Sequence, residues 1–339
     1  MKTYFIADIS ANHDGDFERA KSLCLLAKTS GADAAKFQHF KAETIVSDHG
    51  FKTLGKKSSH QAKWGDSVFQ VYKNASIPID WTPKLKLYCD EIGIDFFTTP
   101  YDLDYVDVID NYVDMYKIGS GDITWIEMLE KIASKGKKVL LATGASTLDD
   151  VKRAMNVFLK NNTPTVIMQC NTNYTAKDEN FKFINLNVLK TYSELYPSSE
   201  LGLSDHTFGD ETVLGAVSLG ARYIEKHFTD DNNRVGPDHA FSMNPVTWKK
   251  MVDSTRRLEM ALGSTEKKIE KNEEETVVLQ RRSIRLNKNL KAGSIIKKED
   301  IFYLRPCPSD ALPLFKDPIG RKLAFDKDKN EYLRQNDIK

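Results

Sequence analysis

The chain has 339 residues, of which 40% are hydrophobic and 29% charged, and its formal net charge at pH 7 is +1. This length allows one large domain with a small one, or two domains of medium size. The balanced charge gives no general reason to expect nucleic acid or an anionic membrane as a partner. Any anion-binding function must therefore come from a local site.

The four cysteines are scattered along the chain and form no C-x-x-C pair: Cys24, Cys89, Cys170 and Cys307. This pattern is typical of reduced thiols in a cytoplasmic protein and not of a disulfide framework. The apolar run near the N-terminus is too short for a signal peptide, and no stretch approaches the roughly 18 apolar residues of a membrane helix. We expect a cytoplasmic protein with no membrane segment.

Short β-rich segments alternate with longer amphipathic segments such as "DFERAKSLCLLAKTSG" and "TLDDVKRAMNVFLKNN". Their apolar residues recur at three- and four-residue spacing, which indicates helices, and several end at a glycine, as at Gly31, Gly93 and Gly136. We predict strands at residues 4–8, 34–38, 95–98, 115–118, 139–142, 165–170, 201–204 and 223–226. Eight such units favour a (β/α)8 barrel over residues 1–265. A doubly wound sheet is the alternative, but the first strand–helix turn lacks G-x-G-x-x-G.

Three further segments interrupt or follow this alternation. Residues 41–80 form an insertion between the second and third strands, which we expect to be a substrate-side loop with a helix of its own. Residues 266–280 are mostly charged and indicate a solvated linker. Residues 281–339 consist of short β-like pieces with a "KAGSII" turn, which indicates a small β-rich domain. About 60 residues is near the lower limit for independent folding, so we expect this domain to dock on another surface.

In a (β/α)8 barrel, functional side chains project from the C-terminal ends of the strands. The predicted strand ends carry polar residues in this order: Asn12, His13, Asp14, Lys36, Gln38, Thr98, Thr99, Lys117, Ser120, Asp122, Thr143, Asn171, Thr172, Asn173, Tyr174, Ser204, Asp205, His206, Glu225 and His227. Two lysines, several hydroxyl groups and glycine-flanked backbone would converge there. Cations and N–H or O–H donors are what a phosphate monoester requires.

His206 and His227 lie 21 residues apart, at the ends of the predicted seventh and eighth strands. Because these strands are neighbours in a barrel, both imidazoles could reach one ion, and such a pair suits Mn²⁺, Zn²⁺ or Fe²⁺. With two protein ligands and open positions, the metal would act as a Lewis acid on a substrate oxygen. The alternative is two hydrogen-bonded structural histidines.

The other histidines give weaker signals. His49 and His60 lie in the insertion, where we expect them to face solvent, and His39 would point away from the barrel interior if its strand continues. His239 follows Asp238 on the loop after the eighth strand and could contact a substrate.

A set of motifs spread over nearly the whole chain resembles the sialic acid synthases. These motifs are "ISANHDG", "GADAAKFQ", "TTPYD", "YKIGSGD", "LATG", "GLSDHT" and "EKHFTDDNNRVGPDHAFSMNP", followed by "RRSIRLNKNLKAGSIIKKEDI" and "LRP". The tail is similar to the antifreeze-like (SAF) domain that is joined to the barrel in these enzymes. The resemblance implies a metal-dependent condensation of phosphoenolpyruvate with an N-acetylated amino sugar to give a nonulosonic acid and phosphate.

The resemblance also implies roles for particular residues. His206 and His227 would hold a divalent metal, Mn²⁺ by preference, with Mg²⁺ or Co²⁺ as alternatives. The positions matching the phosphoenolpyruvate site are Lys36, Thr99, Lys117, Ser120 and Ser204, and those matching the sugar site are Asp14, Gln38, Thr172, Tyr174 and Asp238. Asp14 would take part in proton transfer near the aldehyde. Arg305 would reach the active site of a second subunit, which implies a homodimer with swapped C-terminal domains.

The sequence leaves the acceptor open between N-acetylmannosamine and a 2,4-diacetamido-6-deoxyhexose. It departs from the family pattern at Asp14, at Ala142, in "CNTNY" and in "RPCPSDALP", and these departures concern the sugar more than the condensation. Two other functions remain as alternatives. One is a synthase of the 3-deoxy-ulosonate type, whose phosphorylated sugar would need a second basic cluster. The other is a non-catalytic sugar-binding protein on the same scaffold.

Overall fold

A computed structural model describes residues 2–54, 61, 64, 66–175 and 177–339. The chain divides into two compact units, Met1–Gly263 and Ser264–Lys339. This division lies two residues before the predicted end of the barrel at residue 265. Within the described residues, no helix is long and apolar enough to cross a membrane.

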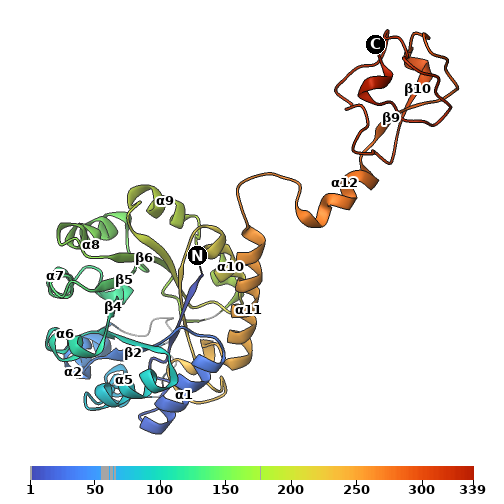
Figure 1. The fold of residues 1–339 in the computed structure, drawn as a ribbon. Helices are drawn as coiled ribbons and strands as arrows, with labels where there is room; N and C mark the ends of the chain where they lie inside the picture. The colour runs from blue at the N-terminus through green and yellow to red at the C-terminus, as the bar shows by residue number, and fades with distance from the viewer. Residues whose placement is uncertain (1, 55–60, 62–63, 65, 176) are drawn as a thin grey trace. The chain divides into compact units, whose positions relative to one another are not determined.

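The first unit is a closed barrel of eight parallel strands in chain order (Figure 1). The strands are β1 (Tyr4–Asp8), β2 (Ala34–His39), β3 (Asp95–Pro100), β4 (Met115–Ile118), β5 (Lys138–Ala142), β6 (Thr165–Cys170), β7 (Glu200–Asp205) and β8 (Tyr223–His227). Pairing of β1 with β8 closes the barrel. The (β/α)8 prediction is confirmed, and the doubly wound alternative is wrong.

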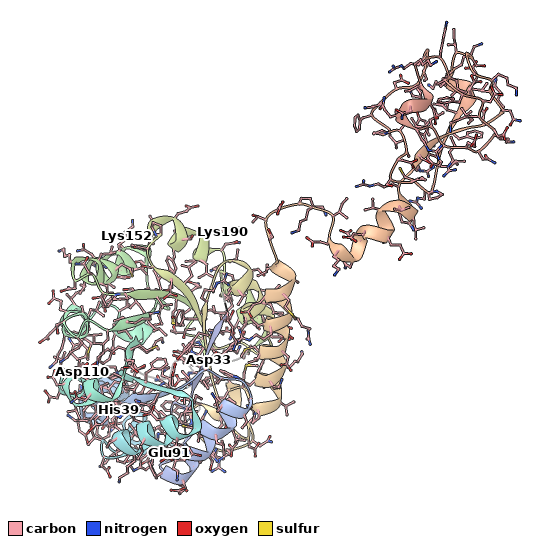
Figure 2. The ribbon with its side chains drawn as sticks, viewed as in Figure 1. Asp33, His39, Glu91, Asp110, Lys152 and Lys190 are labelled. Atoms are coloured by element: carbon pink, nitrogen blue, oxygen red, sulfur yellow. The ribbon has the colours of Figure 1, made fainter. Side chains whose placement is uncertain are left out.

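Helices surround the strands on the outside of the barrel (Figure 1). They are α1 (Phe17–Thr29), α5 (Trp81–Ile92), α6 (Leu103–Ile109), α7 (Ile126–Ala133), α8 (Leu148–Lys160), α9 (Val188–Leu195), α10 (Glu211–Ser218) and α11 (Pro245–Leu262). Local sequence sets their ends. Thr147 and Asp150 form a capping box at the start of α8, and Gly93 ends α5 in the left-handed conformation. Lys152 on α8 and Lys190 on α9 are exposed on this outer ring (Figure 2).

Short elements complete the first unit. The insertion contains α2 (Ala42–Ile45), α3 (Asp48–Thr53) and α4 (Val68–Ala75), so the expected loop has helices of its own. His49 on α3 is exposed, as predicted, whereas His60 lies outside the described residues. Among the described residues of this unit, the 3-10 helices are η2 (Asp110–Tyr112), η3 (Ser120–Asp122), η4 (Asp178–Phe183) and η5 (His239–Phe241).

His39 illustrates how the barrel separates inside from outside. It lies on β2 and is labelled in Figure 2, and its ring nitrogens lie 2.7 Å from the Thr98 and Thr82 hydroxyls. Thr82 belongs to α5, so His39 faces the helices as predicted. Burial lowers the pKa of His39 to about 3, which keeps the ring neutral.

The second unit has a separate small core. It comprises η6 (Lys271–Glu273), α12 (Glu274–Gln280), β9 (Ser283–Leu286), η7 (Lys298–Asp300), β10 (Ile301–Leu304) and η8 (Gln335–Asp337), and β9 pairs antiparallel with β10. Its buried residues include Ile284, Leu286, Ile296, Leu312, Leu323 and Leu333. This small antiparallel sheet fits a SAF domain. Arg305 follows β10 and is exposed.

Candidate active site

The C-terminal ends of the barrel strands line a cavity with two adjoining lobes. The larger, of about 360 Å³, is the polar lobe, lined by Asp8, Lys36, Lys117, Ser120, Ser204 and Glu225 among others. The smaller, of about 150 Å³, is the aromatic lobe, lined by Phe40, Trp64, Val71, Tyr72, Ala75, Pro237 and Asp238 among others. Both lobes share Gln38, Tyr72, Tyr101, Tyr174 and His227. His227 therefore lies at their junction.

Strand periodicity explains which residues face this cavity. Side chains two residues apart on a strand point to the same side, so Lys36 and Gln38 of β2 both face inward, as do Glu225 and His227 of β8. The register places Asp8 opposite both Lys36 and His227. Three charged or polar side chains from neighbouring strands thus lie at one level of the barrel.

The floor of the polar lobe consists of two lysines and two carboxylates, all buried. The Lys36 Nζ lies 2.7 Å from Asp8 Oδ2 and 3.9 Å from Glu225 Oε1, and the Lys117 Nζ lies 3.0 Å from the same Glu225 oxygen. The Ser204 hydroxyl donates to Glu225 Oε1 over 3.1 Å. Two positive and two negative charges therefore balance at the bottom of the cavity.

These pairings keep Lys36 and Glu225 charged. Burial alone would lower the pKa of Lys36, but the neighbouring carboxylates of Asp8 and Glu225 outweigh it, so its pKa is raised. Burial alone would raise the pKa of Glu225, but Lys117 and Lys36 lower it well below its usual range. The raised pKa of Lys36 therefore lets the polar lobe present a lysine cation to an anion at neutral pH.

Two hydroxyl groups and the backbone at Gly144 lie near the lysines. The Gly144 N–H donates to the Ser120 hydroxyl over 2.9 Å, and the Thr99 hydroxyl lies 3.5 Å from the Lys36 Nζ. A Cβ on Gly144 would lie 2.6 Å from the Thr172 methyl, so only glycine fits there. Thr172 packs against this turn and is not among the residues lining either lobe.

His206 and His227 come together as expected from adjacent strands, with ring centroids 5.5 Å apart. The Nδ1 of His206 lies 2.9 Å from the backbone oxygen of Asn171, a contact that leaves Nε2 as the free acceptor. The Nδ1 of His227 is buried and has no hydrogen-bond partner among the described residues. Burial, followed by the effect of His227, lowers the pKa of His206 to about 3. A neutral imidazole with an oriented lone pair fits a metal ligand.

No group of three or more His, Cys, Asp or Glu side chains that could hold a metal occurs in the part of the chain that the structure describes. The nearest carboxylates to His227 are those of Asp8 at 3.7 Å and Asp238 at 3.8 Å. The donor set therefore fits an ion held by two imidazoles, with the remaining positions open to water or substrate.

Behind the two histidines lies a buried ion pair on the outer side of the strands. Lys226 donates to the Asp205 carboxylate and to the Thr207 carbonyl oxygen, and Asp205 also accepts from the Thr212 hydroxyl of α10. Asp205 and Lys226 are directly opposite each other in the β7–β8 register and precede His206 and His227. This pair therefore fixes the strand ends from which both imidazoles project.

Asp14 lies in an outer pocket of about 710 Å³ beside the aromatic lobe, together with Asp66 and Arg234. Its Oδ2 accepts from Arg234 at 2.8 and 3.0 Å and lies 3.1 Å from Arg19, and its Oδ1 lies 2.9 Å from His239 Nε2. Both oxygens are thus engaged. The structure does not bring Asp14 into the cavity that contains the histidine pair.

The structure places the other predicted residues as follows. Tyr174 lies over the histidines, with ring centroids 4.3 Å from His206, and Gln38 donates to Asp8 over 3.1 Å. Asp238 lines the aromatic lobe and accepts from the Ser10 hydroxyl. Arg305 belongs to the second unit.

The comparisons with known proteins identify the family. The model of the NeuB family matches residues 23–267, more than half of the chain. The chain belongs to the NeuB family. It is 33% identical over 98% of its length to the N,N'-diacetyllegionaminic acid synthase of Campylobacter jejuni, covering 99% of that protein. It is 32% identical over 78% of its length to the human N-acetylneuraminate-9-phosphate synthase, covering 73% of it.

A solved structure of the N-acetylneuraminic acid (sialic acid) synthetase of Leptospira borgpetersenii, in complex with citrate, matches with a TM-score of 0.70 and 28% identity. The match covers 82% of this chain and 90% of that one. Relatives named as nonulosonic acid synthases span nearly the full chain, and this NeuB protein is an enzyme of that transferase type.

Sequence reasoning assigned no role to three carboxylates of this NeuB-family site. Asp8 and Glu225 pair with the lysines, and Asp122 lines the polar lobe, where burial raises its pKa to about 6. Glu225 and Asp122 were visible as strand-end residues, and Asp8 ends β1. For Glu225, the available signal was the inward parity that it shares with His227 on β8.

Proposed function

We propose that this enzyme condenses phosphoenolpyruvate with an N-acetylated amino sugar, either N-acetylmannosamine or a 2,4-diacetamido-6-deoxyhexose, to form a nonulosonic acid and phosphate. The supporting observation is one cavity that places two buried lysines beside a buried histidine pair. The lysines suit the phosphate and carboxylate of phosphoenolpyruvate, and the histidines suit a divalent metal. The names of the relatives support the same reaction.

Phosphoenolpyruvate would occupy the polar lobe. Lys36 and Lys117 would exchange part of their contact with Asp8 and Glu225 for contact with the substrate anion, and the Ser120 and Ser204 hydroxyls would donate to phosphate oxygens. The Thr99 hydroxyl, 3.5 Å from the Lys36 Nζ, would help to orient this lysine. Because its pKa is raised by the neighbouring carboxylates, Lys36 would stay charged without substrate, so the site would be preorganised for the anionic phosphoenolpyruvate.

The amino sugar would lie at the junction and in the aromatic lobe. Gln38, Tyr174 and Asp238 would contact its hydroxyl and amide groups, since all three line the aromatic lobe. Thr172 and Asp14 would be further sugar contacts outside the two lobes. Asp14 would contact the part of the sugar that reaches the outer pocket. For the proton transfer that the sequence assigned to Asp14, the Asp238 Oδ2 is better placed, because it lies 3.8 Å from His227 Nδ1.

His206 and His227 would hold the divalent metal, with Mn²⁺ the first choice and Mg²⁺ or Co²⁺ as alternatives. When bound, this ion would polarise the aldehyde of the open-chain sugar. C3 of phosphoenolpyruvate would attack that aldehyde carbon, and water would add at C2. Cleavage of the C–O bond to phosphorus would then release phosphate and leave the keto group of the nonulosonic acid. Tyr174 and Phe241, packed on both histidines, would exclude other water from the reacting atoms.

We further propose a cytoplasmic homodimer in which the C-terminal SAF domain, residues 281–339, covers the active site of the other subunit. Residues 266–280 would be the connecting linker. Arg305 would reach the substrate in that arrangement. Exposed apolar side chains precede it on β10, at Phe302, Tyr303 and Leu304, which supports a docking role for this strand.

The test is phosphate release from phosphoenolpyruvate with each acceptor, in the presence of Mn²⁺ and after chelation. We expect release only when sugar and metal are both present, together with a nonulosonate of the matching mass. Release without an acceptor, or undiminished release in chelator, would contradict the proposal. A 3-deoxy-ulosonate synthase would instead use a phosphorylated aldose, and a sugar-binding homologue would release no phosphate.

A further inference from the structure

His239 is fully buried, although it begins η5 in the segment that follows β8 at the barrel mouth. Both of its ring nitrogens have polar neighbours. The Nδ1 lies 2.7 Å from the Thr229 hydroxyl, and the Nε2 lies 2.9 Å from Asp14 Oδ1. A side chain with no exposed surface does not contact a substrate, so any role of His239 in the reaction must be exerted through a neighbouring residue.

The two partners of His239 belong to different segments of the barrel mouth. Thr229 is buried just beyond the end of β8, and Asp14 lies on the loop after β1. Because carboxylate oxygens only accept hydrogen bonds, the His239 Nε2 carries a proton and donates to Asp14. Asp14 is itself held by Arg19, at 3.1 Å, and by Arg234, at 2.8 Å. The imidazole therefore connects the end of β8 to a fixed point on the loop after β1.

Asp238, the residue before His239, lies beside the histidine pair of the cavity. Its Oδ2 is 3.8 Å from His227 Nδ1. The same oxygen accepts from the Ser10 hydroxyl and, over 3.4 Å, from the Ala11 N–H. Ser10 and Ala11 also belong to the loop after β1. Neighbouring side chains of the segment after β8, Asp238 and His239, thus bind the same loop at two points.

Contacts within the segment after β8 give the Asp238–His239 pair a defined backbone shape. The Asn232 amide donates to the His239 carbonyl oxygen over 2.9 Å, and the Ser242 hydroxyl donates to the Asp238 carbonyl oxygen over 2.6 Å. A Cβ at Gly236 would lie 2.6 Å from His239 Cδ2, so glycine lets the chain approach the ring closely. A shift of the imidazole would therefore move the backbone that carries Asp238.

We propose that His239 is a positioning residue for the Asp238 carboxylate. This inference rests on the function proposed above, in which Asp238 contacts the amino sugar or transfers a proton near its aldehyde. A displacement of about 1 Å in such a group can lower the rate by about 100-fold, even when the altered residue lies away from the reacting atoms. Among the described residues, neither Asp238 nor His239 lines the polar lobe, so phosphoenolpyruvate binding should not depend on this contact.

The test measures kcat/KM for the acceptor and KM for phosphoenolpyruvate in two variants, with whichever proposed amino sugar supports turnover. His239→Leu removes both ring contacts, whereas His239→Gln places an amide donor near the position of Nε2, within reach of Asp14. We expect His239→Leu to lower kcat/KM for the acceptor by about 10-fold or more. His239→Gln should recover at least about 3-fold of this loss, as one restored hydrogen bond does. KM for phosphoenolpyruvate should stay within about 2-fold in both variants, because the polar lobe is unaltered.

A double variant separates positioning from a general loss of stability. Asp238→Ala removes the positioned carboxylate, so adding His239→Leu to it should lower kcat/KM for the acceptor by less than about 2-fold further. A purely structural role of His239 predicts instead that the two losses multiply. Asn233→Ala, at an exposed position of the same segment, is the matched control and should leave both constants unchanged.

Circular dichroism verifies that each variant folds. If His239→Leu does not fold, Thr229→Val removes only the Nδ1 contact, by a change of nearly equal volume at a buried position. Thr229→Val should lower kcat/KM for the acceptor by about 3-fold, and this effect should disappear when Asp238→Ala is also present.

Multiplied losses in the folded double variant, or full turnover in folded His239→Leu, would overturn the inference and leave the proposed function intact. A rise in KM for phosphoenolpyruvate as large as the loss measured for the acceptor would overturn it as well. Failure of the unaltered enzyme to release phosphate with any acceptor would contradict the proposed function itself. The two kinds of failure are therefore distinguishable.

Discussion

The two lobes of the cavity differ in how the fold builds them. The polar lobe is made by strand ends: Lys36 on β2, Lys117 on β4, Ser204 on β7 and Glu225 on β8. The aromatic lobe is made largely by connecting segments, with Phe40 following β2 and Val71, Tyr72 and Ala75 on α4 of the insertion. The barrel therefore fixes the groups proposed for chemistry, while connecting segments line the lobe proposed for the acceptor.

The largest loss is expected from the histidine pair, which stands where the two lobes meet. His206→Ala and His227→Ala should each lower kcat with Mn²⁺ by about 10³-fold or more, because the Lewis acid would lose a ligand. Mn²⁺ affinity, measured by electron paramagnetic resonance, should fall in parallel. His49→Ala, on the exposed helix α3, is the matched control. Mn²⁺ affinity equal to that of the unaltered protein would refute the assignment.

Variants of the buried Lys226–Asp205 ion pair test whether this pair stabilises the ends of β7 and β8, from which the two histidines project. Lys226→Met leaves Asp205 as an unpaired buried charge, so the free energy of unfolding should fall by about 3–5 kcal/mol. The double variant Lys226→Met with Asp205→Asn should recover part of this loss. Lys52→Met in the exposed Lys52–Asp48 pair should cost less than about 1 kcal/mol. Urea denaturation measures all three, and equal losses for the buried and exposed pairs would contradict the argument.

The paired charges of the polar lobe lead to a separate prediction for the KM of phosphoenolpyruvate. Lys117→Met should raise its KM by about 100-fold, because it removes a cation and leaves the Glu225 carboxylate without its closest partner. Adding Glu225→Gln should restore folding stability without restoring substrate binding. The acceptor KM should change much less than that of phosphoenolpyruvate. If the acceptor KM rose most, the two lobes would have been assigned to the wrong substrates.

The smallest effect concerns pH and Asp122. Burial raises the pKa of Asp122 to about 6, so this side chain is neutral below that pH and anionic above it, where it would repel phosphoenolpyruvate. We expect kcat/KM for phosphoenolpyruvate to fall several-fold as pH rises through about 6. The free energy of unfolding should fall earlier, as pH rises from about 4, where the unfolded carboxyl ionises, to about 6, where the folded one does. Asp122→Asn should remove both changes. Since the ionisation of phosphoenolpyruvate is common to both proteins, identical pH profiles would exclude Asp122 as their cause.

The sequence predicted the barrel well because short β-rich segments alternate with amphipathic helices. All eight predicted strands match the structure within two residues. It also brought Lys36, Lys117, His206 and His227 to one face, since strand ends define that face. The roles of these residues stay predictions that the experiments above test.

Other features depend on geometry that strand counting does not give. The pairing of Asp8 with Lys36 follows from the register between β1 and β2, which a linear pattern does not specify. Asp14 turns away because its backbone adopts a positive φ of 53°, where Arg234 and His239 bind it. The aromatic lobe was not predictable, since it needs Phe40, Tyr101 and α4 to meet from separate segments.

The most direct test of the proposed condensation uses phosphoenolpyruvate labelled with ¹⁸O at the oxygen that bridges carbon and phosphorus. The enzyme is incubated with this substrate, Mn²⁺ and a 2,4-diacetamido-2,4,6-trideoxyhexose. Mass spectrometry then measures the ¹⁸O content of the phosphate and of the nonulosonic acid. C–O cleavage after addition of water predicts equal amounts of ¹⁸O-labelled phosphate and unlabelled nonulosonic acid. Label retained in the organic product, or phosphate released without a nine-carbon acid, would contradict the account.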